Sequence, residues 1–372
     1  MSRREERRQA ATDAALRALE RFWQLRLPEL FRSLYRQQEQ PFLGHCEFFT
    51  LDAILAGSGR EYGMLPQLLP FGRAVDEGGL YGFYAPLQKT EVDQWPVLYW
   101  DEDEMFLRPV ASDFGAFLRH CALVGRYELE EQWAEMELYD PEQYQLLAHL
   151  GLAHYKDTPC PRNETELHLA IVESDPQAAL SLCHLGCRRR ANNDDERALD
   201  YFHRAAEAAP WFGDPCYLMA DVYRERGDLA RATEEWWAVL NHLIPLCTRT
   251  WEWDLGADHP EADIYEVAAD ALVQYSRYAD ARFRSDPLWH VAVFDDPYDP
   301  KAREVLGNTY LAQGNFEAAE REFLNALTLA VGEESDQPNR LYDSLIILYE
   351  RTGRSREASL ARYDRALPPP NA

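Results

Sequence analysis

The chain has 372 residues, of which 46% are hydrophobic and 12% aromatic, so it can form two or three domains with buried cores. Its formal net charge of −26 and its pI near 4.8 argue against nucleic-acid binding through a basic surface, because a negative field repels phosphates. Seven cysteines without a CxxC pair indicate neither a disulfide framework nor a zinc ribbon. We recognise no signal peptide and no apolar run of about 18 residues that would span a bilayer, and we expect a cytoplasmic protein.

The first expected element is an amphipathic helix within residues 1–26. Its apolar positions recur at helical spacing: Leu16, Leu19, Trp23 and, beyond the range, Leu27. A second short helix begins at Pro28, which suits a first helical position. We expect one face of this helix to comprise Leu30, Phe31, Leu34 and Tyr35.

Residues 27–125 predict an α+β domain with an antiparallel sheet. Residues 45–57 predict a short strand and a helical turn, and residues 67–87 predict a hairpin. Its turn, Asp76-Glu77-Gly78-Gly79, has glycines that readily adopt positive φ. The bulky run from Val97 to Trp100 predicts the next strand. A closing helix follows Ser112, which we expect to act as its N-cap.

Four consecutive acids follow the strand that ends at Trp100. Adjacent carboxylates on a strand or turn splay apart, and the spacing is not that of an EF-hand, so a metal or catalytic role is disfavoured. The first interpretation is a solvated turn, and the second is a contact with a basic protein partner. The residues of that partner site would be Trp100, Asp101, Glu102, Asp103 and Glu104.

Residues 126–178 are strongly acidic and predict a helical linker, and residues 368–372 predict a disordered tail. His184 lies beside Cys183 and one turn before Cys187, yet the sequence shows no further ligands for a metal, and two thiols lining a helix are the simpler interpretation. GxSxG, Walker and GxGxxG patterns are missing. We therefore expect no catalytic residues, no cofactor and no metal.

Residues 179–367 contain an internal repeat of 34 residues. Ala220 lies 34 residues after Gly186, and a large aromatic, Trp236 or Phe202, follows each small residue at the same distance. A third copy contains Gly307 and Phe323, and in a fourth Arg362 replaces the aromatic, which suits a terminal repeat. Between residues 243 and 299 the pattern is degenerate.

This half resembles tetratricopeptide (TPR) proteins. The resemblance implies stacked antiparallel helix pairs, in which the first helix of each pair lines a concave binding groove. Carried over to this chain, the groove would include Tyr217, Asp221, Arg224, Glu304, Asn308, Asp343 and Glu350. The mixed charges of these residues identify no ligand.

The N-terminal half is similar to the SUKH superfamily, the group that includes Smi/Knr-type regulators of cell-wall synthesis. The resemblance rests on four motifs in order, "LPELFRSLY", "LLPFGRAVDEGGLYGFY", "PVLYWDEDE" and "VASDFGAFL", and covers roughly residues 27–123. Leu80 departs from the pattern, since the family often has Asp after the glycines. The resemblance implies a domain that binds protein, and in bacteria such domains are commonly immunity proteins against toxins, often nucleases.

Three functions remain open from the sequence. The first is a non-enzymatic immunity protein whose acidic surface covers the basic site of a toxin. The second is a TPR scaffold or adaptor that binds an endogenous partner, for example in cell-wall or signalling control. The third is a hydrolase with an unrecognised carboxylate site. None of them predicts a nucleic-acid or membrane partner, and the oligomeric state is left open.

Overall fold

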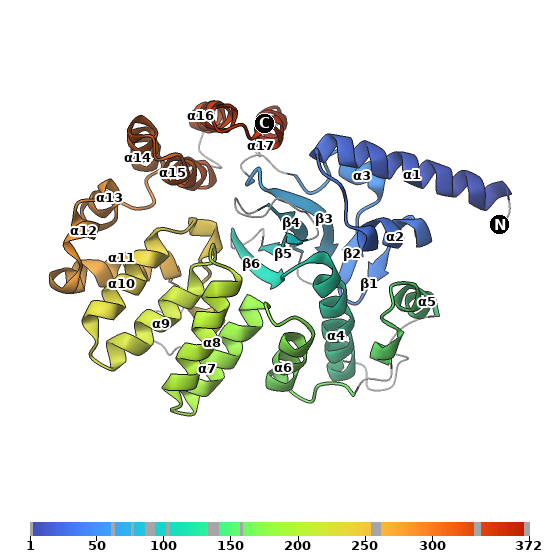
Figure 1. Ribbon diagram of the computed structural model, residues 1–372, viewed down its shortest axis with the longest axis horizontal. Coiled ribbons are helices and arrows are strands. Elements are labelled where there is room, and N and C mark those ends of the chain that lie inside the picture. Colours follow the sequence, from blue (N-terminus) through green and yellow to red (C-terminus); the bar gives the residue numbers. More distant parts are fainter. Residues whose placement is uncertain are drawn as a thin grey trace. The chain divides into compact units, whose positions relative to one another are not determined.

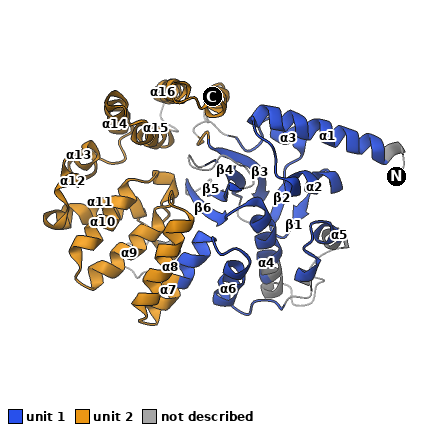
Figure 2. Cartoon of the chain, viewed as in Figure 1, with its two compact units in different colours: residues 1–60, 67–185 blue, residues 61–66, 186–372 orange. Residues whose placement is uncertain are grey.

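The computed structural model describes most of the chain in nine stretches. These are residues 3–60, 64–75, 78–85, 94–101, 105–132, 141–156, 159–253, 262–330 and 336–367. The chain divides into two compact units, one of residues 1–60 and 67–185 and the other of residues 61–66 and 186–372 (Figure 2). The predicted fold class is confirmed, because an antiparallel sheet with helices is followed by a long helical region (Figure 1).

The first unit contains a six-stranded antiparallel sheet whose strands lie in chain order. The strands are β1 Phe42–Leu43, β2 Cys46–Phe48, β3 Leu68–Ala74, β4 Leu80–Tyr84, β5 Val97–Asp101 and β6 Phe106–Ala111. Its helices are α1 Arg3–Trp23, α2 Glu29–Gln37, α3 Leu51–Leu55, α4 Phe114–Gln132, α5 Pro141–His149, η2 Ala153–Lys156 and α6 Glu164–Ser174. Helix α7, Ala179–Ala191, begins in the first unit and continues into the second, so this unit extends beyond the end predicted for the α+β domain.

The predicted hairpin is formed by β3 and β4. Gly78 has a φ of 77°, and the Ala74 amide donates to the Gly79 carbonyl at 2.9 Å. The turn residues Asp76 and Glu77 lie outside the described stretches. The pairing register shifts between Pro70 and Gly72, so Phe71 is the extra residue of a bulge.

Aromatic rings join the helices to one face of the sheet. The ring centroids of Phe71 and Phe83 are 4.9 Å apart, and Phe31 of α2 lies 5.2 Å from Phe114 of α4 and 5.6 Å from Phe83. Edge-to-face and tilted contacts at these distances are the favoured geometry for aromatic pairs. Helices α2 and α4 therefore share a core with β3 and β4.

Helix α1 ends at Trp23, within the range expected for the first helix, and Leu27 is buried beyond its end. Two other sequence expectations in this unit are wrong. Leu30 is 39% exposed and does not join the apolar face of α2. Ser112 does not cap α4, because the Asp113 carboxylate accepts from the Ala116 amide at 2.7 Å. A carboxylate in this position satisfies an amide of the first turn in the way expected for the hydroxyl.

From residue 186 onward, the described part of the second unit consists of helices joined by loops. After the end of α7 come α8 Asp195–Ala208, α9 Asp214–Glu225, α10 Leu229–Leu240, η3 Ile244–Leu246, η4 Thr250–Trp253, α11 Ile264–Tyr275, η5 Ser276–Tyr278, α12 Ala281–Arg284, α13 Pro287–Phe294, α14 Pro300–Gln313, α15 Phe316–Leu329, α16 Gln337–Arg351 and α17 Ser355–Arg365. The short helices from η3 to α13 occupy the stretch where the sequence repeat is degenerate.

The repeated small residues allow helices to approach closely. A Cβ atom on Gly186 would lie 2.3 Å from the Phe202 ring, and one on Gly307 would lie 2.7 Å from the Phe323 ring. Such distances leave no space for a methyl group. The structure is therefore consistent with the repeat, while its TPR identity stays a prediction.

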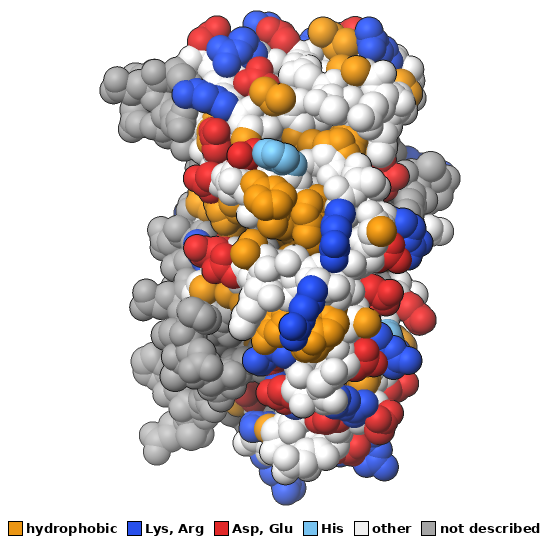
Figure 3. Space-filling model, turned by 90° about the vertical axis from the view of Figure 1, so that its left-hand side faces the viewer, with side chains coloured by type: hydrophobic (Ala, Val, Ile, Leu, Met, Phe, Trp, Pro, Cys, Tyr) orange, Lys and Arg blue, Asp and Glu red, His pale blue; other side chains and the backbone are white. Residues whose placement is uncertain are grey.

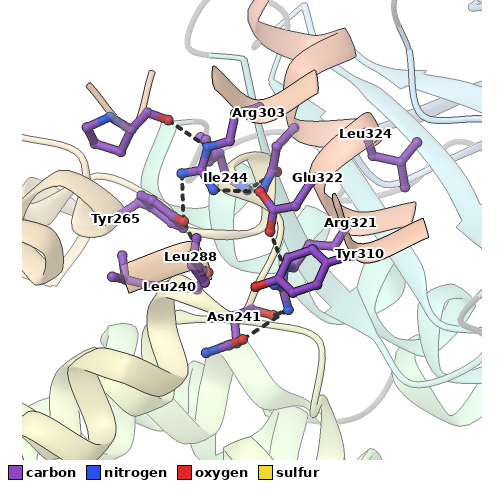
Figure 4. Close-up of polar contacts among 12 residues, drawn as sticks. Leu240, Asn241, Ile244, Tyr265, Leu288, Arg303, Tyr310, Arg321, Glu322 and Leu324 are labelled. Atoms are coloured by element: carbon purple, nitrogen blue, oxygen red, sulfur yellow. Dashed lines mark hydrogen bonds and ion pairs between the residues drawn. The ribbon is translucent and has the colours of Figure 1, made fainter. Parts of the chain in front are cut away.

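A buried network of charges joins α11, α14 and α15 (Figure 4). The Arg303 guanidinium donates to the Glu322 carboxylate at 2.7 Å and to the Tyr265 hydroxyl at 2.7 Å, and both charged side chains are 0% exposed. The second Glu322 oxygen accepts from Arg321 at 2.7 Å. Burial alone would raise the pKa of Glu322, but the two guanidiniums hold it below its usual value.

Removing the central carboxylate of this network should be costly. We expect Glu322→Ala to lower the free energy of unfolding by about 3–5 kcal/mol, because it leaves a buried guanidinium without its counter-charge. Urea unfolding followed by circular dichroism measures the loss. Glu317→Ala, an exposed position on the same helix, is the control and should change stability by less than about 0.5 kcal/mol. Equal losses for the two variants would contradict the structural role of the network.

Candidate functional site

The acidic run lies where β5 is connected to β6. Strand β5 ends at Asp101, whose partner across the antiparallel pair is Phe106, and Trp100 pairs with Leu107. Trp100 is only 4% exposed, so it belongs to the core and offers little surface to a partner. Asp101 is half-buried, and residues 102–104, the other three acids, lie outside the described stretches. The partner site predicted here stays a prediction.

The groove residues predicted on α9 lie in a partly buried ion-pair cluster. Tyr217 and Asp221 are both buried, and burial raises the pKa of Tyr217 to about 12. The Asp221 carboxylate forms ion pairs with Arg190 at 2.5 Å and with Arg224. These contacts hold the end of α7 against α9.

The remaining predicted groove residues also have partners within the second unit. Glu304 accepts from Gln337 at 3.0 Å, while the exposed Asn308 donates to the Glu304 carbonyl of its own helix at 2.9 Å. Asp343 and Glu350 of α16 form ion pairs with the last helix, α17. Their α17 partners are Arg365, at 2.9 Å, and Arg362. Whether the seven residues bind a ligand stays a prediction.

Four histidines that are far apart in the sequence lie close together in the first unit. They are His45 between β1 and β2, His120 on α4, His168 on α6 and His184 on α7. The ring centroids of His45 and His120 are 5.8 Å apart, and those of His168 and His184 are 4.2 Å apart with nearly parallel planes at 12°. We call these four residues the histidine cluster.

Two glycines bring the first pair of histidines together. Gly44, in the β1–β2 turn, has a φ of 58°, and a Cβ on Gly125 of α4 would lie 2.4 Å from its Cα atom. The turn therefore touches the helix backbone directly, which only glycine allows at both positions. His45 follows Gly44, and this contact places it against His120.

The buried carboxylate of Asp175 helps to position the second pair of histidines, His168 and His184. Asp175 follows α6, and its two oxygens accept from the Ser112 amide at 2.9 Å and the Ser112 hydroxyl at 2.7 Å. The Gln177 amide, which leads into α7, donates to the same carboxylate at 3.1 Å. These bonds connect α6 and the start of α7 to the junction of β6 and α4. His168 and His184 are thereby held in the same unit as His120.

Burial is the main influence on the protonation of the histidine cluster. It lowers the pKa of His45 and His168 to about 4 and that of His120 and His184 to about 3. A second proton nearby would lower the pKa further: one on His45 or His168 that of His120, and one on His168 that of His184. The charge of Arg108 on β6 also lowers the pKa of His184. All four rings are therefore neutral near pH 7.

Two residues of the histidine cluster form, together with Glu164, the donor set of a metal site. The ligand atoms of Glu164, His168 and His184 all lie within 4.8 Å of one another. The sequence pattern associates His184 only with Cys183 and Cys187 and does not predict this group. The i, i+4 spacing of Glu164 and His168 places them on one face of a helix, and this is the part of the group that the sequence could have indicated. That His184 joins them depends on how α6 packs on α7, which the sequence does not show.

The sheet, α2 and the beginning of α4 lie in a segment that a family model describes. Residues 10–120 match the SMI1 / KNR4 family (SUKH-1). This SUKH-1 match covers less than a third of the chain, begins within α1 and ends before the helical repeats. It includes His45 and His120 but not Glu164, His168 or His184. No curated protein matches the chain. Among its described helices, none is long and apolar enough to cross a membrane.

The neutral histidines predict a specific pH dependence. The pKa of His120 is about 3 in the folded state and about 6.5 in an unfolded chain. Between these values the unfolded state binds more protons, so the contribution of His120 to stability is complete above pH 6.5 and is lost as the pH falls. We expect His120→Gln to reduce the dependence of the unfolding free energy on pH by about 1.4 kcal/mol per unit between pH 4.5 and 6.

Urea unfolding across this pH range measures the slope. His149→Gln is the control, since His149 is an exposed histidine of the same unit, and it should leave the slope unchanged. If the unfolding free energy of the His120→Gln variant depends on pH as steeply as that of the wild type, His120 is not a buried, uncharged ring in the folded protein.

Proposed function

We propose that this protein is a non-enzymatic protein-binding molecule, and that it acts as an immunity protein that neutralises a cognate bacterial toxin. The observation that carries the proposal is the SUKH-1 match over residues 10–120, because the SUKH family is associated with immunity proteins. The matched segment contains the whole antiparallel sheet. In this proposal inhibition comes from surface complementarity, and the protein performs no reaction on the toxin.

The negative net charge of the chain supports a partner with a basic surface. The chain carries a formal net charge of −26, and a toxin that cleaves nucleic acid needs a positive site for its substrate. Opposite potentials accelerate the encounter of two proteins and disfavour wrong partners. The acids that connect β5 to β6 would then guide the toxin to this domain.

A specific observation favours scaffolding as the second candidate. The second unit exposes several large apolar side chains, among them Phe294 at 69%, Val305 at 66% and Ile347 at 47%. On the face shown in Figure 3, hydrophobic side chains gather in clusters between charged ones. Exposed apolar clusters with a polar rim are typical of protein-binding surfaces. In this alternative, TPR-like helix pairs bind an endogenous protein and the SUKH-1-like domain connects it to a second partner.

Co-expression distinguishes the two candidates. The protein is produced together with a toxin encoded beside it, and growth is compared with that of cells producing the toxin alone. Rescue of growth, together with a complex of the two purified proteins, supports the immunity function. Toxicity that persists when both proteins are present and soluble would exclude this toxin–immunity pair, and an endogenous partner recovered with the full chain would then favour the scaffold.

The acidic connection should affect the speed of binding. Replacing Asp101, Glu102, Asp103 and Glu104 by alanine should slow association with the toxin about tenfold or more at low salt and flatten its salt dependence, since rim charges act mainly on the association rate. Stopped-flow mixing at several salt concentrations measures both effects.

A matched control separates the local effect from that of net charge. Four exposed acids of the second unit are replaced by alanine instead, namely Glu196, Asp200, Glu207 and Glu234. This variant has the same charge change and should bind at nearly the wild-type rate. If both quadruple variants slow association equally, net charge alone accounts for steering, and the β5–β6 connection is a solvated turn.

A further inference from the structure

Two side chains of the histidine cluster and a neighbouring carboxylate converge from two helices. Glu164 and His168 are one turn apart on α6 and share a face, and His184 approaches from α7. Their ligand atoms lie within 4.8 Å of one another. Two imidazoles and one carboxylate are a donor set that zinc uses in proteins, with the fourth position left for water. We propose that Glu164, His168 and His184 bind a Zn²⁺ ion.

The distance between carboxylate and imidazole fits an ion between them. The Glu164 Oε1 and His168 Nε2 atoms are 3.9 Å apart, which is too long for a direct hydrogen bond. With zinc–ligand distances of about 2.0–2.2 Å, two ligand atoms of a tetrahedral zinc are roughly 3.4 Å apart. A small rotation of the Glu164 side chain, which is 61% exposed, closes this difference.

The Nδ1 atom of His168 has a hydrogen-bond partner, as the second nitrogen of a metal-binding histidine usually does. This atom lies 3.0 Å from the Oγ atom of the buried Ser181 on α7. When Nδ1 donates its proton to this hydroxyl, the Nε2 lone pair points toward Glu164, where it can bind a cation. Without a cation, that tautomer would place a lone pair beside a carboxylate, which is unfavourable.

The second histidine has a matching orientation and charge state. The rings of His168 and His184 are stacked with 12° between their planes, so their nitrogen lone pairs run side by side. Their ligand atoms are close enough that a rotation of one ring brings both to the same ion. Burial keeps both rings neutral near pH 7, as zinc ligands must be, so zinc need not displace a proton from either ring. The nearby charge of Arg108 opposes a cation, and the Glu164 carboxylate offsets it.

The exposure of the Glu164 carboxylate determines how an ion would enter this site and whether it keeps a water ligand. The two rings are partly buried and Glu164 reaches solvent, so an ion can enter from the Glu164 side and keep a water ligand there. Such a site would connect α6 to α7 and strengthen the corner that Asp175 already fixes. This inference does not depend on the toxin-binding proposal, since it concerns residues beyond the SUKH-1 match.

Titration calorimetry with Zn²⁺ tests the proposal. The full chain is produced without a histidine tag, stripped with chelator and titrated in excess Mg²⁺, which occupies exposed carboxylates but competes poorly for imidazole. We expect one zinc per chain. Glu164→Gln, His168→Gln and His184→Gln should each weaken binding at least about tenfold. Glu173→Gln on α6 and His203→Gln on α8, both exposed, should leave binding unchanged.

Further measurements distinguish zinc binding at this site from zinc binding to acidic side chains on the surface. Co²⁺ in place of Zn²⁺ should give the intense visible absorption of a tetrahedral site, and this should be lost in the Glu164→Gln variant, whose exposed position makes misfolding an inadequate explanation. The proposal is overturned if zinc does not saturate at one equivalent in Mg²⁺, if the three ligand variants bind as the wild type does, or if cobalt gives the weak spectrum of an octahedral ion.

Discussion

The first unit depends on the buried carboxylate of Asp175. Its oxygens bond to the amide and hydroxyl of Ser112, 63 residues away in the chain, and to the amide of Gln177. A buried carboxylate is costly unless its lone pairs are satisfied, and here three donors satisfy them. The result is that α6 and the start of α7, which follow the SUKH-1 match, form one compact unit with the sheet that the match contains.

The second unit holds its helices together in two different ways. One is periodic, since a glycine faces an aromatic ring in the pairs Gly186–Phe202 and Gly307–Phe323. The other occurs once among its described residues, where Arg303 and Glu322 are fully buried together. The periodic contact gives the helix pairs a common geometry. The buried pair joins α14 to α15, and its neighbours connect both to Tyr265 of α11, within the degenerate stretch, and through Arg321 to Asn241 before it. Buried pairs of this kind tolerate few alternative arrangements, because either charge alone would be unsatisfied.

The two candidate sites of the first unit differ in chemistry. The β5–β6 connection offers carboxylates at the end of a strand whose apolar residues build the core, and it suits long-range attraction of a basic protein. The histidine cluster offers neutral nitrogen donors in a partly buried corner and suits a transition-metal ion. The SUKH-1 match includes the connection as well as His45 and His120, and it ends before Glu164, His168 and His184.

The sequence by itself determined the α+β and helical halves, the β3–β4 hairpin, the 34-residue repeat and the acidic run. These depend on local signals, namely periodicity, turn glycines and adjacent charges, which are readable within about 40 residues. Only the tertiary structure decided that Ser112 bonds to Asp175 and that His184 meets His168 and Glu164. Such contacts join residues on different elements, and whether two polar side chains meet depends on how those elements pack, which no local pattern specifies.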